Sequence, residues 1–201
     1  NTAGWRGSRA LWLDAARQAF VETGVDAVKI QPLAERLALS RTSFYWFFKD
    51  RAALLNALLE HWEETNTGAL IDACDAYAET LSEAILNLIS VFIAETDFDP
   101  RLDFSVRGWA AQSADVMARV ASADERRIAA IKALFVHFGF AREEADVRAH
   151  AVYLVQIGYI SLQVAEDTAT RVNRASEYVR IYTGRTPSER ELARFRARHE
   201  C

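Results

Sequence analysis

The stretch LALSRTSFYWFFKD, residues 37–50, contains five aromatic residues in succession, from Phe44 to Phe48. In a helix, positions 44 and 48 share one face, and positions three or four residues apart share a neighbouring one. We therefore expect Phe44 and Phe48 to enter the core beside the preceding helices. The neighbouring stripe is polar and cationic and holds Arg41, Tyr45 and Lys49.

Two short helices joined by a tight connection are predicted around this stretch. One covers about residues 31–38, with Pro32 tolerated in its first turn, and Ser40 is a good N-cap for the next. This is the outline of a helix-turn-helix, in which the first turn of the second helix reaches base edges. Around it, Ser8 can cap a first helix that ends near Gly24, and Asp50 can cap a fourth.

At this point the sequence resembles the tetracycline-repressor (TetR) family of bacterial transcriptional regulators, over about residues 9–58. The resemblance begins with AARQAFVETGVDAVKIQPLAERL and continues with LSRTSFYWFFKDRAALLNAL. The family pattern has Thr, Tyr, Phe, Lys and Leu where this chain has Ser43, Tyr45, Phe48, Arg51 and Leu54. The match is specific because it involves several spaced positions.

The resemblance implies an all-α protein with two parts. Residues 8–53 would be a three-helix helix-turn-helix DNA-binding domain, and residues 54–201 a helical regulatory and dimerisation domain. It also implies which side chains meet DNA. Base or near-base contacts are assigned to Arg41, Thr42 and Ser43. Phosphate contacts are assigned to Tyr45, Lys49 and Arg51, and Gln31 contributes from the preceding helix. Trp46 is placed along the sugar-phosphate chain. For Trp46 and Phe47, packing on the first and fourth helices is the equal alternative.

Two positions depart from the family pattern. Ala38 stands in the turn where the family usually has Gly, and a left-handed alanine would cost on the order of 1 kcal/mol. Lys29 stands where Thr or Ser commonly caps the second helix. Both departures bear on how the helix-turn-helix would lie on DNA.

Composition is consistent with a mostly helical globular protein. Of the 201 residues, 51% are hydrophobic and 26% charged, with only 8 Gly and 3 Pro. Residues 1–51 hold 8 Lys/Arg against 5 Asp/Glu, whereas the rest of the chain holds 16 against 23. A basic N-terminal part on an acidic body fits a domain that meets a polyanion, although chance accounts for a difference of this size equally well.

The sequence gives no sign of a membrane span or a secretory signal. Cys74 and Cys201 are isolated thiols without metal-ligand spacing, which favours a reducing cytoplasm and no structural zinc. We expect no metal and no cofactor.

Beyond residue 66 the apolar spacing predicts longer helices. One helix covers about residues 78–95, a short helix carries LDFSVRGWA, and a further helix stops at Gly139. Two more cover residues 142–166 and 169–183. A capping box at Thr186–Glu189 then starts an arginine-rich terminal helix. By the family resemblance, the helices at 142–166 and 169–183 pair with their mates in a homodimer, the alternative being burial within the same chain.

A small-molecule effector site is expected in the helical body, where aromatic walls and a few polar anchors typify a ligand pocket. The candidate side chains are Trp62, Phe92, Arg107, Trp109, Gln112, Phe135, Tyr153 and Gln156. Arg107 could answer an anionic ligand, or it could form an intrahelical pair with Asp103. An aromatic stripe of this kind is also typical of plain core.

The leading hypothesis is a dimeric regulator that binds a palindromic operator in double-stranded DNA and is released by its effector, hence a repressor. One alternative is a DNA-binding protein of the same fold that senses no small molecule. The other is an all-α enzyme or carrier. Against the latter, the sequence has no HExxH, no Gly-rich phosphate loop, no GxSxG and no Cys–His pair, and no catalytic residue is predicted.

Overall fold

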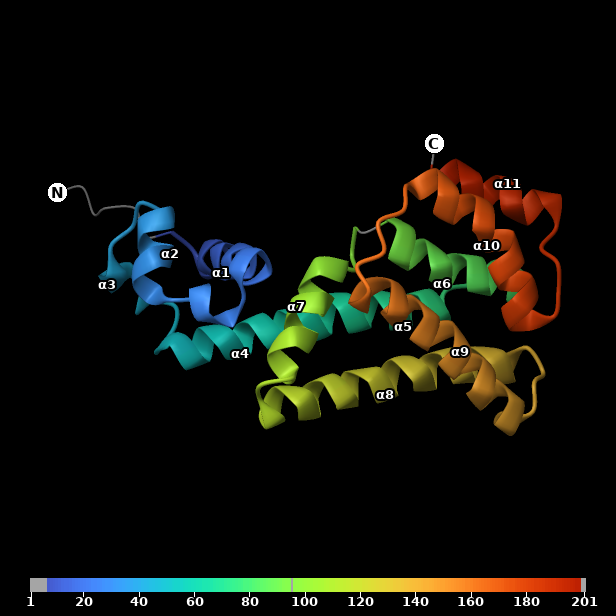
Figure 1. The fold of residues 1–201 in the computed structure, drawn as a ribbon, viewed down its shortest axis with the longest axis horizontal. Coiled ribbons are helices and arrows are strands. Elements are labelled where there is room, and N and C mark those ends of the chain that lie inside the picture. Colours follow the sequence, from blue (N-terminus) through green and yellow to red (C-terminus); the bar gives the residue numbers. More distant parts are fainter. Residues whose placement is uncertain (1–6, 95, 200–201) are drawn as a thin grey trace. The chain divides into compact units, whose positions relative to one another are not determined.

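The computed structural model describes residues 7–94 and 96–199, and within these ranges the chain is all-α (Figure 1). This confirms the predicted fold class. The elements are α1 (Arg9–Thr23), the 3₁₀ turn η1 (Val25–Ala27), α2 (Ile30–Arg36), α3 (Arg41–Phe44), α4 (Arg51–Trp62), the π-helical turn η2 (Glu63–Thr67), α5 (Gly68–Asp75), α6 (Leu81–Ala94), α7 (Pro100–Ala110), α8 (Ala114–His137), α9 (Arg142–Ser161), α10 (Thr168–Thr183) and α11 (Glu189–Arg198).

The chain divides into two compact units that interleave in sequence. The first, here the N-terminal unit, comprises the chain up to Glu63 together with Arg101–Met117. The second, here the regulatory unit, comprises Glu64–Pro100 and the chain from Ala118 onward. The segment that carries α7 therefore belongs with the helix-turn-helix and not with the neighbouring sequence.

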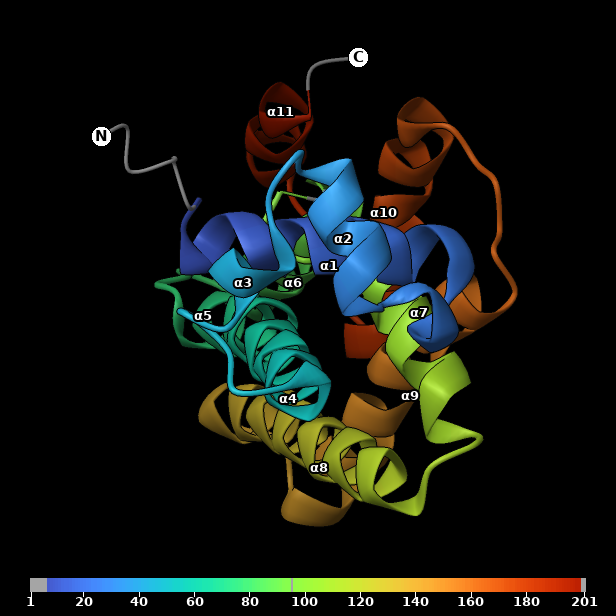
Figure 2. The ribbon, with the colours of Figure 1, turned by 90° about the vertical axis from the view of Figure 1, so that its left-hand side faces the viewer.

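In the N-terminal unit, α1, α2 and α3 group at the start of α4 (Figure 2). The predicted caps explain where the helices begin, because Ser8 accepts from the backbone N–H of Leu11 at 3.1 Å and Asp50 from that of Ala53 at 2.8 Å. α1 buries one stripe from Trp12 to Phe20, as its apolar spacing predicts. The ring of Phe20 meets that of Trp109 on α7 edge to face at 5.8 Å.

The regulatory unit has its own hydrophobic core. α6 is buried along most of its length, and α5 and α10 both pack against it. At the terminal helix, Leu192 and Phe195 point into this core, while Arg194 and Arg198 reach Glu83 and Asn87 on α6. The arginine-rich helix is thus a packed element whose cations lie at its outer edge.

Several predicted boundaries were wrong, for local reasons. The expected helix at 142–166 ends at Ser161, because Gln163 adopts a left-handed backbone with φ of 50°. The capping box is formed by Ser188 and Glu191, so Pro187 precedes the cap and does not open the helix. η2 and α5 were missed, because no helix was predicted between residue 66 and about residue 78.

None of the helices in the described ranges combines the length and apolar character that crossing a membrane would require. Cys201 lies outside the described residues. Cys74 is buried, and burial raises the pKa of its thiol to about 12, which keeps it protonated and unreactive.

Candidate nucleic-acid interface

The aromatic run divides between core and surface. Phe44 and Phe48 are 0% and 4% exposed, with their rings stacked at 5.5 Å, and Trp12 on α1 meets Phe44 edge to face at 5.4 Å. This confirms that the two phenylalanines anchor the segment. The guanidinium of Arg9 lies 5.2 Å from the centre of the Phe48 ring, a cation–π contact that ties the start of α1 to the same anchor.

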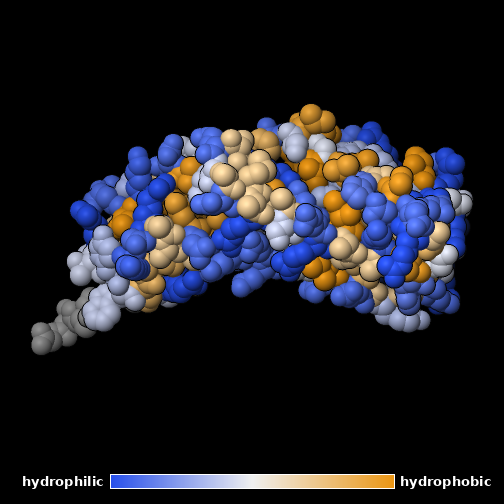
Figure 3. Space-filling view, turned by 90° about the horizontal axis from the view of Figure 1, so that it is seen from below, coloured by the Kyte–Doolittle hydropathy of each residue, from blue (hydrophilic) through white to orange (hydrophobic). Residues whose placement is uncertain are grey.

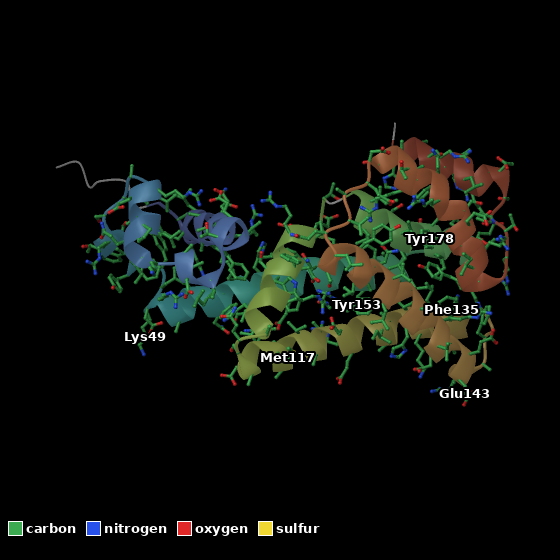
Figure 4. All side chains as sticks on the ribbon, in the orientation of Figure 1. Lys49, Met117, Phe135, Glu143, Tyr153 and Tyr178 are labelled. Carbon is green, nitrogen blue, oxygen red and sulfur yellow. The ribbon has the colours of Figure 1, made fainter. Side chains whose placement is uncertain are left out.

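The other residues of the segment lie outward. Tyr45 is 52% exposed and Trp46 is 63% exposed, while Phe47 is half-buried. Arg41, Thr42 and Lys49 are exposed as well, and Lys49 is labelled at this end of the chain in Figure 4. Five of the predicted DNA-binding side chains are therefore brought together on one short, solvent-facing segment.

The helix that presents them is shorter than predicted. α3 has a single turn, Arg41–Phe44, whose N-cap Ser40 accepts from the backbone N–H of Ser43 at 3.3 Å. The chain then continues as turns, with the N–H of Phe48 donating to the carbonyl of Phe44 at 3.1 Å. Lys49 consequently lies beyond the helix, although it remains on the exposed side.

Two other predicted DNA-binding residues, Ser43 and Gln31, already make hydrogen bonds within the protein. Ser43 is buried, and its hydroxyl donates to the carbonyl of Ser40 at 2.6 Å. Gln31 is exposed at the start of α2, where its amide donates to Glu35 at 2.6 Å. Their contacts to DNA stay predictions.

Arg51 ties the start of α4 to the loop before α2. Its Nε donates to the carbonyl of Val28 at 2.5 Å and its Nη2 to that of Val25 at 2.7 Å. Both acceptors lie more than 20 residues earlier in the chain. The guanidinium therefore holds the η1 loop in place, and a phosphate contact by the same group stays a prediction.

The turn between α2 and α3 has a left-handed residue at position 38. Ala38 has φ of 52°, in the left-handed region that favours glycine. The N–H of Ala38 donates to the carbonyl of Glu35 at 3.1 Å, and that of Leu39 to the carbonyl of Ala34 at 2.9 Å. This is the Schellman pattern of a helix C-terminus, formed here with alanine at the position usually taken by glycine.

The start of α2 lacks a side-chain cap. Lys29 occupies the N-cap position with extended backbone, and its side chain makes no capping hydrogen bond. α2 is instead tied to α1 by the ion pair of Arg36 with Glu22, at 2.7 Å between Nη2 and Oε2. Because both side chains are substantially exposed, this pair contributes little stability.

The residues predicted to hold an effector divide equally between the two units. Four of them belong to the N-terminal unit, and the other four belong to the regulatory unit. In the N-terminal unit, Trp62 is fully buried and its indole N–H donates to Asp103 at 2.8 Å. Arg107 donates to the same carboxylate at 2.8 Å, so the intrahelical pair is what the structure contains. Gln112 is exposed and Trp109 is half-buried.

In the regulatory unit the four predicted residues are buried. Phe92, Phe135 and Tyr153 belong to its hydrophobic core, and Gln156 is 5% exposed. The rings of Phe92 and Phe98 meet at 4.9 Å, and those of Phe135 and Phe140 at 5.5 Å. Figure 4 labels Phe135 and Tyr153 among the helices of this unit.

The sequence reading missed the most unusual group in the regulatory unit, Arg127. Its side chain is 0% exposed, and its Nη1 donates to the Tyr153 hydroxyl at 3.1 Å. In the sequence it stands in the run ADERR, which reads as a solvated charge cluster. The signal was in the helical spacing, since Arg127 falls on the buried stripe of α8 formed by Val120, Ala123, Ile131 and Leu134.

Comparison with known proteins bears on the N-terminal unit first. Residues 13–58 match the sequence model of the family described as bacterial regulatory proteins, tetR family. The chain is 36% identical over 59 residues to the HTH-type transcriptional regulator TtgR of Pseudomonas putida, a match that covers 29% of this chain and 28% of that protein. It is 39% identical over 46 residues to the class D tetracycline repressor protein of Escherichia coli, covering 23% and 21% of the two chains.

Solved structures resemble the chain over most of its length. Salmonella enterica GusR aligns with a TM-score of 0.70 at 18% identity, covering 88% of this chain and 93% of that one. A TerR/AcrR-family regulator of Aquifex aeolicus aligns with a TM-score of 0.65 at 14% identity, covering 87% and 99%. At such identities the likeness concerns the fold alone. The predicted resemblance to the TetR family is confirmed, with its sequence evidence confined to the helix-turn-helix.

Proposed function

We propose, from the premise that residues 13–58 are a TetR-family N-terminal domain, that the chain is a dimeric transcriptional repressor. It would bind a palindromic operator and leave it when a small molecule binds the regulatory unit. The matched sequence relatives are described as regulators, but the matches span less than a third of their length. The proposed activity of the whole chain is therefore argued from the chemistry of the exposed segment, residues 41–49.

The observation that carries the proposal is the outward face of residues 41–49. It presents the cations Arg41 and Lys49 with the hydrogen-bonding side chains of Thr42 and Tyr45, and it contains no carboxylate. The next acid, Asp50, caps α4. A cationic face with polar side chains at the start of a short helix suits the major groove, where phosphate contacts supply affinity and base edges supply selectivity.

Each side chain has a proposed role that follows from its position. Arg41, at the first position of α3, can donate two parallel hydrogen bonds to a guanine, worth roughly 1–3 kcal/mol of selectivity. Tyr45 and Lys49 would contact phosphates on either side, with Trp46 against the sugar-phosphate chain. Ser43 and Arg51 support this arrangement from within by fixing the start of α3 and the η1 loop.

Selection of bound fragments from genomic DNA tests this function. We expect enrichment of a palindrome whose half-sites are one helical turn, about 34–36 Å, apart. The affinity should fall with salt, by a slope of about 0.9 in log–log terms for each phosphate that is neutralised. Recovery of fragments without a shared sequence, with equal affinity for all, would contradict the proposal.

Dimerisation through α9 and α10 is part of the proposal. These helices and the loop between them carry large apolar side chains that the single chain leaves exposed: Val147, Leu154, Leu162, Val164 and Ile181. Val147 and Leu154 are seven residues apart on α9 and so lie on one face. On the side of the molecule seen in Figure 3, apolar groups in orange likewise interrupt the polar surface.

Sedimentation equilibrium tests the dimer directly. The wild-type chain should sediment as a dimer, and Leu154→Asp and Ile181→Asp should each shift it toward monomer. Met117→Asp is the matched control, because Met117 is 48% exposed on α8 and outside the proposed surface. A monomeric wild type, or equal dissociation by all three variants, would count against this surface.

Effector release would work by coupling between two sites. A ligand shifts the protein toward the conformation it binds better, and the operator shifts it toward the other. The spacing of the two recognition segments in the dimer is the quantity that both would change. This is the proposed mechanism of repression and its relief.

A further inference from the structure

The regulatory unit encloses a guanidinium in its interior. Arg127 is fully buried on α8, where its Nε donates to the hydroxyl of Thr67 at 3.0 Å and its Nη1 to that of Tyr153 at 3.1 Å. The buried stripe on which it lies is otherwise apolar. Burying a charge is costly, and such groups concentrate at functional sites.

The carboxylate that faces Arg127 is shared and only partly buried. Asp124, three residues earlier on α8, lies 3.9 Å from Nη1, and its side chain is 27% exposed. It also accepts a hydrogen bond from the Tyr153 hydroxyl at 2.5 Å. Tyr153 thus stands between the cation and the anion, and a rotation of its hydroxyl would let it donate to a different acceptor.

A second buried tyrosine hydroxyl belongs to the same core. Tyr182 on α10 is 4% exposed, and its hydroxyl has no hydrogen-bond partner among the residues that the structure describes. Gln156 faces this hydroxyl closely enough to affect the pKa of Tyr182, but burial dominates and raises that pKa, and no hydrogen bond of ordinary geometry forms. Gln156 is three residues after Tyr153, so the polar groups follow one side of α9.

Aromatic rings belong to the same core as these groups. The Arg127 guanidinium lies 5.7 Å from the centre of the Phe98 ring, which in turn contacts Phe92. All the rings belong to the core of the regulatory unit, together with Tyr153 and Tyr182. A cation, an unsatisfied hydroxyl and aromatic walls are the elements of a small-molecule site.

We propose that this cluster binds an effector with a carboxylate at one end and a hydrogen-bonding group at the other, joined by an apolar or aromatic body. The carboxylate would accept from Arg127 and Tyr153, and the far group would pair with Tyr182 and Gln156. The inference rests on the proposed function, since it specifies the class of effector. Arg127 also takes the place of Arg107 as the proposed receptor for an anion, because Arg107 is paired with Asp103.

Thermal unfolding of the full chain with three acids tests the inference. The probes are 4-hydroxybenzoate, 4-hydroxyphenylacetate and 4-hydroxycinnamate, which place a carboxylate and a phenol at three separations. Each is compared with its neutral carboxamide. We expect at least one acid to raise the Tm by about 5 °C at a concentration near 100 times its Kd, while its carboxamide leaves the Tm unchanged.

Variants locate the effect. Arg127→Met should abolish the Tm shift, and Arg126→Met, an exposed neighbour on the same helix, should retain it. Tyr182→Phe removes only a hydroxyl, so its fold should persist, and its Kd for the acid should rise about tenfold. Circular dichroism establishes that each variant is folded before the comparison; if Arg127→Met is not, Tyr153→Phe takes its place with a predicted loss of affinity.

Three results would overturn the inference: no shift with any of the acids, equal shifts with acids and carboxamides, or a shift that survives in Arg127→Met and Tyr153→Phe. Binding of genomic fragments by the unliganded protein is measured in parallel. If the protein binds no specific DNA, the proposed function fails. If it binds specific DNA but ignores all three acids, only the class of effector is wrong.

Discussion

Replacing Ala38 by glycine should stabilise the N-terminal unit, although glycine usually weakens a folded chain. Ala38 has φ of 52° in the turn between α2 and α3, and its side chain is exposed. A left-handed backbone costs an L-residue roughly 1–2 kcal/mol, and glycine avoids that cost. Against this, glycine adds about 0.4–1 kcal/mol of conformational entropy to the unfolded chain. Because the exposed methyl group contributes little packing, the net gain should be about 0.5–1 kcal/mol.

Urea unfolding followed by tryptophan fluorescence suits this measurement. All five tryptophans stand at or before position 109 in the sequence, and the four that the structure describes belong to the N-terminal unit. With a urea m-value of about 2 kcal/mol/M, the midpoint should rise by about 0.25–0.5 M at unchanged slope.

The control is a pair of variants in the middle of α1, where the backbone is right-handed. Gln18 is exposed there, and Gln18→Gly should unfold about 1 kcal/mol more easily than Gln18→Ala. Glycine would thus stabilise at position 38 and destabilise at position 18. If Ala38→Gly lowers the midpoint as the glycine at position 18 does, the turn is not left-handed at Ala38 and the Schellman geometry is refuted.

Three further predictions concern the supports of the two units. At the uncapped start of α2, Lys29→Ser should be more stable than Lys29→Ala by about 1 kcal/mol in the same fluorescence assay, and equal stabilities would mean that position 29 is not the N-cap. Arg51→Lys keeps the charge but loses the two-pronged contact with the carbonyls of Val25 and Val28, so it should lower the unfolding free energy by about 2 kcal/mol. An unfolding free energy equal to that of the wild type would contradict a structural role for this contact. In the regulatory unit, the pKa of Glu83 is held below its usual value, chiefly by the backbone N–H of Glu79 and then by Arg194. The contribution of Glu83 to stability is therefore present above the unfolded-state pKa near 4.5 and is lost as the pH falls through the lower folded-state pKa. Urea midpoints by circular dichroism should therefore fall less on acidification in Glu83→Gln than in the wild type, and parallel curves would contradict the assignment.

Local signals predicted the N-terminal unit well because its geometry is set by nearby residues. Ser8, Ser40 and Asp50 each cap a helix through an N–H three residues away, so sequence spacing alone identifies them. Phe44 and Phe48 are four residues apart and share one buried face. The left-handed backbone at Ala38 was only suggested by the glycine usual in the resembled family, and the structure has it, with φ of 52°.

The roles of Ser43 and Arg51 could not be predicted in the same way. Their partners are backbone carbonyls, which any residue provides, and those of Arg51 lie 23 and 26 positions away. A family pattern assigns such residues to DNA by position, but the pattern carries no information about a competing internal acceptor. Tyr45 and Trp46, by contrast, are 52% and 63% exposed and so remain accessible to DNA.

The regulatory unit depends on contacts between distant parts of the sequence. Arg127 meets Thr67 and Tyr153, which are 60 and 26 positions away, so its charged neighbours in sequence conceal its burial. The predicted effector residues were likewise chosen by type, and the structure distributes them over two units. Aromatic spacing identified buried positions but could not say which of them surround a polar group.

If the exposed face of residues 41–49 reads DNA, the Arg41→Ala/Tyr45→Ala variant should lose affinity for the selected operator. Arg126→Ala, which removes an exposed cation from α8, is the control. We expect the double variant to keep the wild-type unfolding midpoint but to bind the operator at least a hundredfold more weakly, a loss of about 3 kcal/mol or more. Operator binding by the double variant with wild-type affinity would contradict this expectation.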